Sequence, residues 1–228
     1  MFAYIPARIG SKRIKQKNIR LLDGKPIICH VIEQLMRVPA LTGIAVSTDS
    51  ELIQACVSSY SKVTTLALRT ADIADDQASF MDLIRNDLPR FEQHFGSHEV
   101  VFTLATAALI TDNFFTQGIE LYQQHTGLVM SVASLPTSVH LALEVNEQGS
   151  LAPLFPEKYP LPTAQLTPLY ADAGGFYIFD TQQLRTKSMF IELNPIHPVP
   201  LPANIALDID DEADWQLLEQ QYAQLHSF

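Results

Sequence analysis

Short apolar runs alternate along this chain with longer segments in which apolar residues recur at helical spacing. The runs are predicted strands at residues 2–6, 44–47, 63–68, 99–105, 127–134, 170–179 and 196–201. Predicted helices occupy residues 26–37, the segment from 48 onward, 81–95, 111–125 and the segment from 211 onward. Strands that alternate with helices predict an α/β fold with a Rossmann-like, doubly wound and mostly parallel sheet that carries helices on both faces.

This alternation stops between residues 136 and 169. Two short strands, at 140–145 and 151–155, flank a turn at 146–149 and predict a hairpin. The prolines of this region exclude long regular structure; they are Pro153, Pro156, Pro160, Pro162 and Pro168. At 228 residues, 47% of them apolar, the chain can bury one sizeable core. We therefore predict a single domain over residues 1–228 with a small inserted arm at about 136–169.

Positive charge is concentrated directly after the first predicted strand. Seven of the 15 lysines and arginines lie among the first 25 residues, against one acid, which gives a local charge of +6, whereas the rest of the chain carries −16. Ligands of open α/β sheets bind outside the carboxyl ends of the strands, where amides and basic side chains face phosphates. The loop has neither the P-loop nor the dinucleotide-binding pattern. It predicts a polyphosphate site of another design, and a solvated surface loop is the ordinary alternative.

Other features argue against several classes of protein. Cys29 and Cys56 lack the spacing of a metal site, so buried thiols in a reducing compartment are expected. No charged leader with a following apolar segment is present, and the first core strand begins at residue 2. We therefore expect a cytoplasmic protein without a membrane anchor. A single basic focus in an acidic chain argues against a nucleic-acid partner.

The segment after the first strand resembles the opening signature of the acylneuraminate cytidylyltransferases. Ile5–Ile19 reads IPARIGSKRIKQKNI and Gly24–Ile27 reads GKPI, although the family's usual Pro between Ile14 and Lys17 is missing. A later segment, VSTDSELI at 46–53, also resembles the family. Three others are closer to its pseudaminic acid branch; they are LATAAL at 104–109, LFPE at 154–157 and YADAGGFY at 170–177. The resemblance implies a nucleotide-diphospho-sugar transferase-like fold. It also implies an enzyme that transfers CMP from CTP to pseudaminic acid or another nine-carbon 2-keto sugar acid and releases pyrophosphate.

The resemblance also implies roles for individual residues. The catalytic cations, which would neutralise the triphosphate and the departing pyrophosphate, are Arg8, Lys12, Arg13 and Lys17. The rest of the nucleotide site is Ala7, Gly10, Ser11, Asn18, Arg69, Asp76 and Ser79. The residues expected at the sugar substrate are Thr106, Asp172 and Gly174. The inserted arm implies a homodimer.

Two late carboxylates are the metal candidates. Asp208 and Asp210 alternate at a predicted strand end, roughly 7 Å apart on one face. Mg²⁺ prefers oxygen ligands and is commonly held by one or two carboxylates together with substrate phosphates. The pair also matches the D-x-D step of the resembling family, which implies Mg²⁺ as the cofactor. The acids that follow, Asp211, Glu212 and Asp214, are expected to favour the positive end of the last helix.

Three other acids have a local explanation. Asp49 is either a helix cap or a site residue, and we favour the cap. Asp75 or Asp76 either caps the helix predicted at 81–95 or contacts the nucleotide.

Several positions depart from the pseudaminic branch where polar sugar contacts are expected. They are Leu141, Pro162, Ala171 and Gly175, and bulky Phe80 also replaces a small or hydroxylated residue near the base. An acidic, hydroxyl-rich sugar is recognised through charge-assisted hydrogen bonds, which these residues cannot make. Two hypotheses follow. The chain is an active transferase for a nonulosonic acid, or a degenerate paralogue that binds CTP and Mg²⁺ without acting on a sugar.

Overall fold

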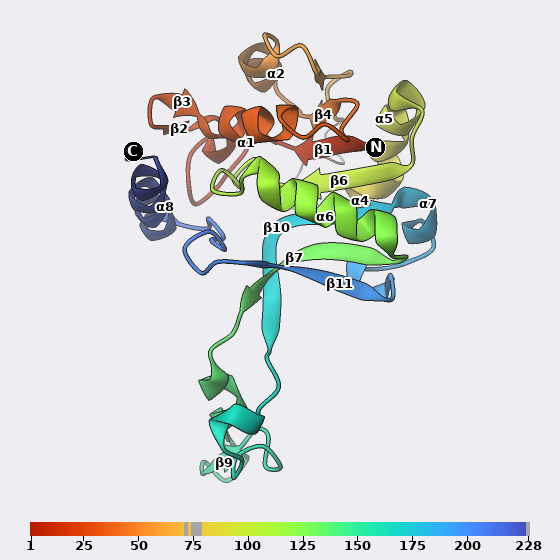
Figure 1. The fold of residues 1–228 in the computed structure, drawn as a ribbon. Helices are drawn as coiled ribbons and strands as arrows, with labels where there is room; N and C mark the ends of the chain where they lie inside the picture. The colour runs from red at the N-terminus through yellow and green to blue at the C-terminus, as the bar shows by residue number, and fades with distance from the viewer. Residues whose placement is uncertain (71–72, 74–78, 227–228) are drawn as a thin grey trace.

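A seven-stranded sheet organises the protein, in the order β11-β7-β10-β6-β1-β4-β5 (Figure 1). The computed structural model describes residues 1–70, 73 and 79–226. The strands are β1 (Phe2–Pro6), β4 (Ile44–Ser47), β5 (Val63–Thr64), β6 (Glu99–Thr103), β7 (Leu128–Ser134), β10 (Tyr170–Asp180) and β11 (Ile196–Leu201). Strand β10 is antiparallel to both of its neighbours, and the other pairs are parallel. The prediction of a mostly parallel sheet is therefore confirmed.

Helices cover both faces of this sheet (Figure 1). Side chains alternate along β1, so that Ala3 and Ile5 pack on one face, with α1 (Ile27–Met36), α6 (Asp112–Gln124) and α8 (Glu212–Leu225). Phe2 and Tyr4 pack on the other, with α4 (Phe80–Asn86), α5 (Leu88–Phe95) and α7 (Thr181–Leu184). Because both faces of β1 are buried, its sequence is continuously apolar. The doubly wound prediction is confirmed.

Some predicted elements differ from the structure. Strand β5 is two residues long and does not continue to residue 68. The helix expected at 81–95 is two helices, α4 and α5, which meet at the buried Asp87. Pro89 lies in the first turn of α5, where its missing N–H is tolerated. In α2 (Glu51–Val57), Leu52 is 61% exposed and faces solvent.

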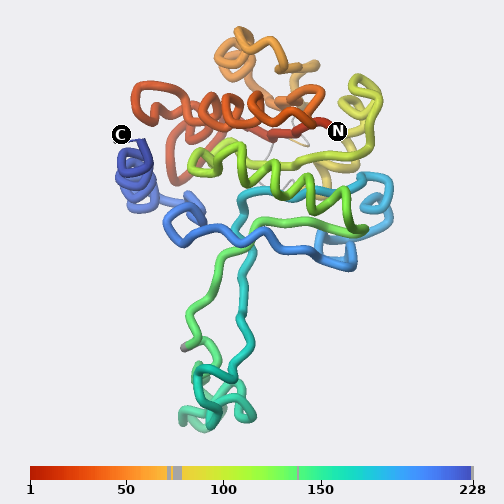
Figure 2. The backbone as a smooth tube through the Cα atoms, in the orientation of Figure 1, coloured from red at the N-terminus to blue at the C-terminus, as the bar shows by residue number. Residues whose placement is uncertain are grey.

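The inserted segment forms an arm that projects away from the sheet. The chain leaves after β7 and returns into β10, and the far end of the loop lies well away from the other strands (Figure 2). There, β8 (Leu143–Val145) pairs with β9 (Leu151–Pro153) as the predicted hairpin. Apolar side chains are exposed along this segment; they are Leu141, Leu143, Val145, Leu151, Leu154 and Tyr159. Among the residues that the structure describes, no helix is long and apolar enough to cross a membrane.

Candidate active site

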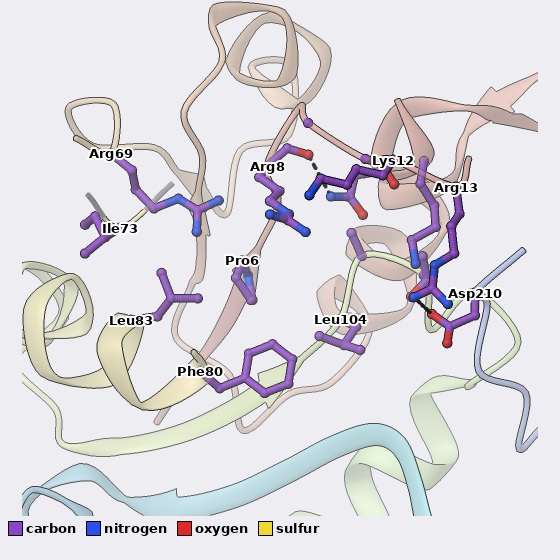
Figure 3. A pocket seen from close by; sticks show the side chains of 16 residues that line it. Pro6, Arg8, Lys12, Arg13, Arg69, Ile73, Phe80, Leu83, Leu104 and Asp210 are labelled. Carbon is purple, nitrogen blue, oxygen red and sulfur yellow. Dashed lines mark hydrogen bonds and ion pairs between the residues drawn. The ribbon is translucent and has the colours of Figure 1, made fainter. Parts of the chain in front are cut away.

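A cavity of about 430 Å³ opens at the carboxyl end of β1 (Figure 3). Its walls come from the loop after β1, the segment around Arg69, the start of α4, the loop after β6 and the loop before α8. Of the residues predicted for the nucleotide site, it brings together Arg8, Gly10, Ser11, Lys12, Arg13, Lys17, Asn18 and Arg69. This size lies within the range of small-molecule sites.

Two of the described residues predicted for the nucleotide site, Ala7 and Ser79, do not line the cavity. Ala7 is fully buried, and its amide donates to the Ser47 carbonyl over 2.8 Å. Ser79 caps α4, because its Oγ accepts from the Asp82 amide over 3.2 Å and donates to the Asp82 carboxylate. Ser79 is therefore the N-cap of α4. Asp76, like Asp75, lies outside the described residues.

The cavity has a cationic half and an apolar half. Arg13 and Arg69 lie on opposite sides of it, with the ring of Phe80 on the floor between them (Figure 3). The cations on the Arg13 side are those of the loop after β1. Apolar side chains line the other half; they are Pro6, Ile73, Phe80, Leu83 and Leu104. This division suits a ligand with a charged end and a planar, weakly polar end.

Arg69 carries unused hydrogen-bonding capacity into the apolar half. The residue is only 7% exposed, and its Nε and Nη2 have no hydrogen-bond partner among the described residues. Its backbone is fixed, because the Arg69 amide donates to the Thr48 carbonyl over 2.8 Å. Buried donors of this kind are nearly always paired in folded proteins. Arg69 therefore supports a ligand with acceptor atoms in this half of the cavity.

The cationic loop is held in shape by groups outside it. The Asp49 carboxylate accepts a hydrogen bond from the Ile9 amide over 2.8 Å. Within the loop, the Asn18 side chain donates to the Arg8 carbonyl over 2.9 Å. We favoured Asp49 as the helix cap, and this was wrong: Ser50 caps α2 by accepting from the Leu52 amide. Asp49 instead fixes the loop from the neighbouring strand end.

One of the two residues between Ile14 and Lys17 has an unusual backbone conformation. Gln16 adopts a left-handed conformation with φ of 51°. Proline cannot adopt a positive φ, because its ring holds φ near −65°. A proline at Gln16 would therefore force the turn before Lys17 into another shape.

The loop is joined to the segment before α8, which lies almost 200 residues later in the chain. Arg13 pairs with Asp210 at 2.8 Å (Figure 3). Lys17 Nζ donates to the Ile209 carbonyl. Burial lowers the pKa of Lys17, and the Asp210 and Asp208 carboxylates oppose this shift. The cationic loop and the segment before α8 are therefore in contact.

The two metal candidates do not lie at a strand end as we expected. Strand β11 ends at Leu201, and Asp208 and Asp210 occupy the loop before α8. The loop is fixed because the Asp214 carboxylate accepts from the Asp210 amide over 2.8 Å. Asp211 caps α8 together with Asp214, as predicted.

Two carboxylates beside a cationic phosphate site fit a hard cation that completes its shell with ligand oxygens and water. Among the described residues, no group of three or more His, Cys, Asp and Glu side chains could hold a metal by itself.

Of the three residues predicted at the sugar substrate, two line a cavity and the third does not. Thr106 lines the main cavity and also a much smaller one beside it, which contains Asp208 and Gly174. Asp172 lines neither cavity, and its carboxylate accepts from the Gly174 amide over 2.8 Å and from the Tyr177 hydroxyl over 2.7 Å. His140, which we expected to be structural, is buried and hydrogen-bonded to the Thr167 carbonyl.

Sequence reasoning missed part of the apolar wall. Pro6 ends β1, and Leu104 and Ala105 directly follow β6. Their position just after buried strands was the available signal, because the carboxyl ends of parallel strands meet at one edge of a sheet.

The fold and the cavity define an α/β protein with a cationic cavity at the carboxyl ends of the strands. The profile of the cytidylyltransferase family matches residues 2–151, which is most of the chain. The chain belongs to this family. The prediction of a CTP-dependent nucleotidyltransferase is thereby confirmed.

Two relatives match almost the whole chain. A pseudaminic acid cytidylyltransferase of Campylobacter jejuni (strain 81-176) is 30% identical over 225 residues, which cover 97% of this chain and 96% of the relative. A CMP-N,N'-diacetyllegionaminic acid synthase of Legionella pneumophila (strain Philadelphia 1) is also 30% identical, with 96% and 95% covered.

Solved structures share the fold at lower identity. A CMP:2-keto-3-deoxy-manno-octonic acid synthetase complexed with CTP gives a TM-score of 0.69 at 17% identity, with 98% of each chain covered. A 4-diphosphocytidyl-2C-methyl-D-erythritol synthase of Anaerococcus prevotii gives 0.64 at 11% identity, with 98% of this chain and 96% of that chain covered. The predicted fold class is confirmed.

Asp49→Ala is expected to weaken CTP binding by about tenfold, because the Ile9 amide loses its acceptor and the cationic loop loosens. Ser50→Ala is the matched control, since it removes only the cap of α2. Isothermal titration calorimetry measures both affinities. Equal CTP affinities in the two variants would contradict the role given to Asp49.

Proposed function

We propose that this chain transfers CMP from CTP to pseudaminic acid or a related nine-carbon nonulosonic acid, releasing pyrophosphate and giving a CMP-activated sugar for surface glycan or flagellin glycosylation. One observation carries the proposal: the cationic loop pairs with Asp210 at the wall of a cavity large enough for a nucleotide. The two relatives named for such sugars match this chain over nearly its full length, which supports the acceptor class.

The two halves of the cavity support one orientation of CTP. The triphosphate lies against Arg8, Lys12, Arg13 and Lys17, whose charges offset its own. The cytosine lies in the apolar half, where Phe80 offers an aromatic contact and Arg69 offers donors to the acceptor atoms of the base. Aromatic contacts with a base contribute roughly 1–3 kcal/mol each in other nucleotide-binding proteins.

Catalysis on this arrangement depends on positioning and charge. The anomeric hydroxyl of the acceptor attacks the α-phosphorus in line, and pyrophosphate leaves from the opposite side. Arg13 and Lys17 stabilise the charge that develops on the departing group. Mg²⁺, held by Asp208 and Asp210, would neutralise and orient the phosphate oxygens.

No contact or distance among the described residues supports the degenerate paralogue. The proposed catalytic cations and Asp210 line the main cavity, and Asp208 lines the smaller cavity beside it. Of the departing positions, Leu141 and Pro162 belong to the arm and Ala171 to β10. At Gly175 an added Cβ would lie 2.4 Å from Ile110 Cδ1, so a larger residue there requires the Ile110 side chain to move.

The arm supports a homodimer. Its hairpin has only two strands and cannot bury its own apolar side chains. Val145 and Leu151 are 70% and 66% exposed, and exposed apolar patches commonly mark interaction surfaces. The occupant we propose is the arm region of a second copy. The single-domain organisation and the cytoplasmic location remain predictions.

Wild-type protein, incubated with CTP, Mg²⁺ and a panel of nonulosonic acids, is expected to release pyrophosphate with at least one acceptor. Lys17→Ala should lower kcat by about 100-fold or more, because a half-buried cation at the phosphates is lost. Lys15→Ala is the control, since Lys15 is exposed on the same loop and outside the cavity. Failure of every acceptor would overturn the proposed function, and a fully active Lys17→Ala would remove the role of Lys17.

Light scattering coupled to size-exclusion chromatography tests whether the arm forms the dimer contact. The wild type should have twice the chain mass, and Val145→Glu with Leu151→Glu should shift it to the monomer, because two charges cannot be buried unpaired at the contact. Leu52→Glu, on exposed α2, is the control and should remain dimeric. A monomeric wild type, or a dimer that tolerates both arm charges, would refute this interface.

A further inference from the structure

Strand β10 contains a large bulge opposite Ser131 of β7. Asp172 pairs with Val132 and Tyr177 pairs with Met130, so the four residues 173–176 of β10 face a single residue of β7. An insertion of this kind interrupts the ladder and leaves main-chain groups that need other partners. The shape of the bulge therefore depends on the side chains that form hydrogen bonds with these main-chain groups.

Two buried hydroxyls satisfy the main chain of the bulge. Ser131 Oγ accepts from the Gly175 amide over 3.2 Å and from the Phe176 amide over 2.9 Å. Thr103 Oγ1, on β6, donates to the Gly175 carbonyl over 2.8 Å. Ser131 and Thr103 are both fully buried. Removal of either hydroxyl leaves a buried main-chain group without its hydrogen-bond partner. The bulge must change shape for that group to form another hydrogen bond.

Asp172 and Gly174 define the outer surface of the bulge. The Asp172 carboxylate holds the Gly174 amide, and Gly174 has φ of 63°. A Cβ placed on Gly174 would meet nothing within 4 Å, so the backbone is open to approach at this point. Gly175 faces inward, toward Ile110 and Ser131. The bulge thus presents bare main chain on its open side.

The bulge lies beside the groups that would surround the reacting phosphorus. The small cavity lined by Gly174 and Gly175 also contains Asp208, and it shares Thr106 with the nucleotide cavity. Its volume of about 10 Å³ is at most that of one water, so a sugar cannot enter it. Burial raises the pKa of Tyr177, and so do the hydrogen bond to Asp172 and the charges of Asp172 and Asp208. Because its charge contributes to this shift, Asp208 lies close to this segment. An acceptor that reaches Asp208 from outside therefore meets the open side of the bulge.

We propose that Ser131 and Thr103 are positioning residues for the acceptor: they fix the bulge as the platform on which the sugar lies beside Asp208 and Thr106. The inference rests on the proposed function and extends it to residues that touch neither substrate. The bulge forms no part of the wall of the nucleotide cavity. A change in its shape is therefore expected to act on one of the two substrates and not on the other. Disturbing the bulge should affect the acceptor and leave CTP binding unchanged.

Steady-state kinetics on Thr103→Val and Thr103→Ser provides a matched test. Valine keeps the shape of threonine without the hydroxyl, whereas serine keeps the donor to Gly175. With the acceptor found active for the wild type, Thr103→Val and Ser131→Ala should each raise the KM for that acceptor about tenfold and leave the KM for CTP unchanged. Thr103→Ser should stay near the wild type.

Thr181→Val controls for the loss of a buried hydroxyl at the far end of β10. Thr181 is fully buried, and its Oγ1 has no hydrogen-bond partner among the described residues. It should leave both KM values unchanged.

Parallel changes in both KM values, or an unchanged acceptor KM in Thr103→Val, would overturn the inference alone. Absence of turnover by the wild type with every acceptor would overturn the proposed function and this inference with it. If Ser131→Ala does not fold, the Thr103 pair still decides the question.

Discussion

The contact between the loop after β1 and the segment before α8 is the constraint on which the site depends. Arg13 pairs with Asp210, Lys17 with the Ile209 carbonyl, and Arg20 with Glu212 while lying over Trp215. Each exposed ion pair alone contributes little stability. Together they hold a strongly cationic loop, whose like charges repel one another, against an acidic segment that offsets them. The cavity exists because these two segments meet over the end of β1.

This arrangement also explains how an acidic protein binds a polyphosphate. The chain carries a formal charge of −10, yet its first 25 residues carry +6. A concentrated positive field inside a cleft attracts an anionic ligand even when the net charge repels it. The nearby acids Asp208 and Asp210 would repel the same phosphates, so a cation between them is the arrangement that satisfies both charges. We therefore propose that the metal and the nucleotide bind as one unit.

Much of the fold was predictable because periodicity and strand ends are local properties. The limits of β1 and β4 and the order of most elements follow from apolar runs, and the cationic loop is visible in the composition of the first 25 residues. What failed depended on partners distant in the chain. Asp49 looks like a helix cap locally, but its carboxylate accepts from Ile9, 40 residues away. Ser131 is one polar residue in an apolar strand, and only the tertiary fold reveals that it supports the bulge of β10.

The Mg²⁺ dependence of CTP affinity, measured by calorimetry, tests the central claim most directly. In the wild type, Mg²⁺ should tighten CTP binding, because the cation joins the phosphates to Asp208 and Asp210. In Asp208→Asn with Asp210→Asn, CTP should still bind through the cationic loop, but Mg²⁺ should no longer improve its affinity. An equal gain from Mg²⁺ in both proteins would show that the aspartates do not hold the metal against the nucleotide, and it would contradict the account.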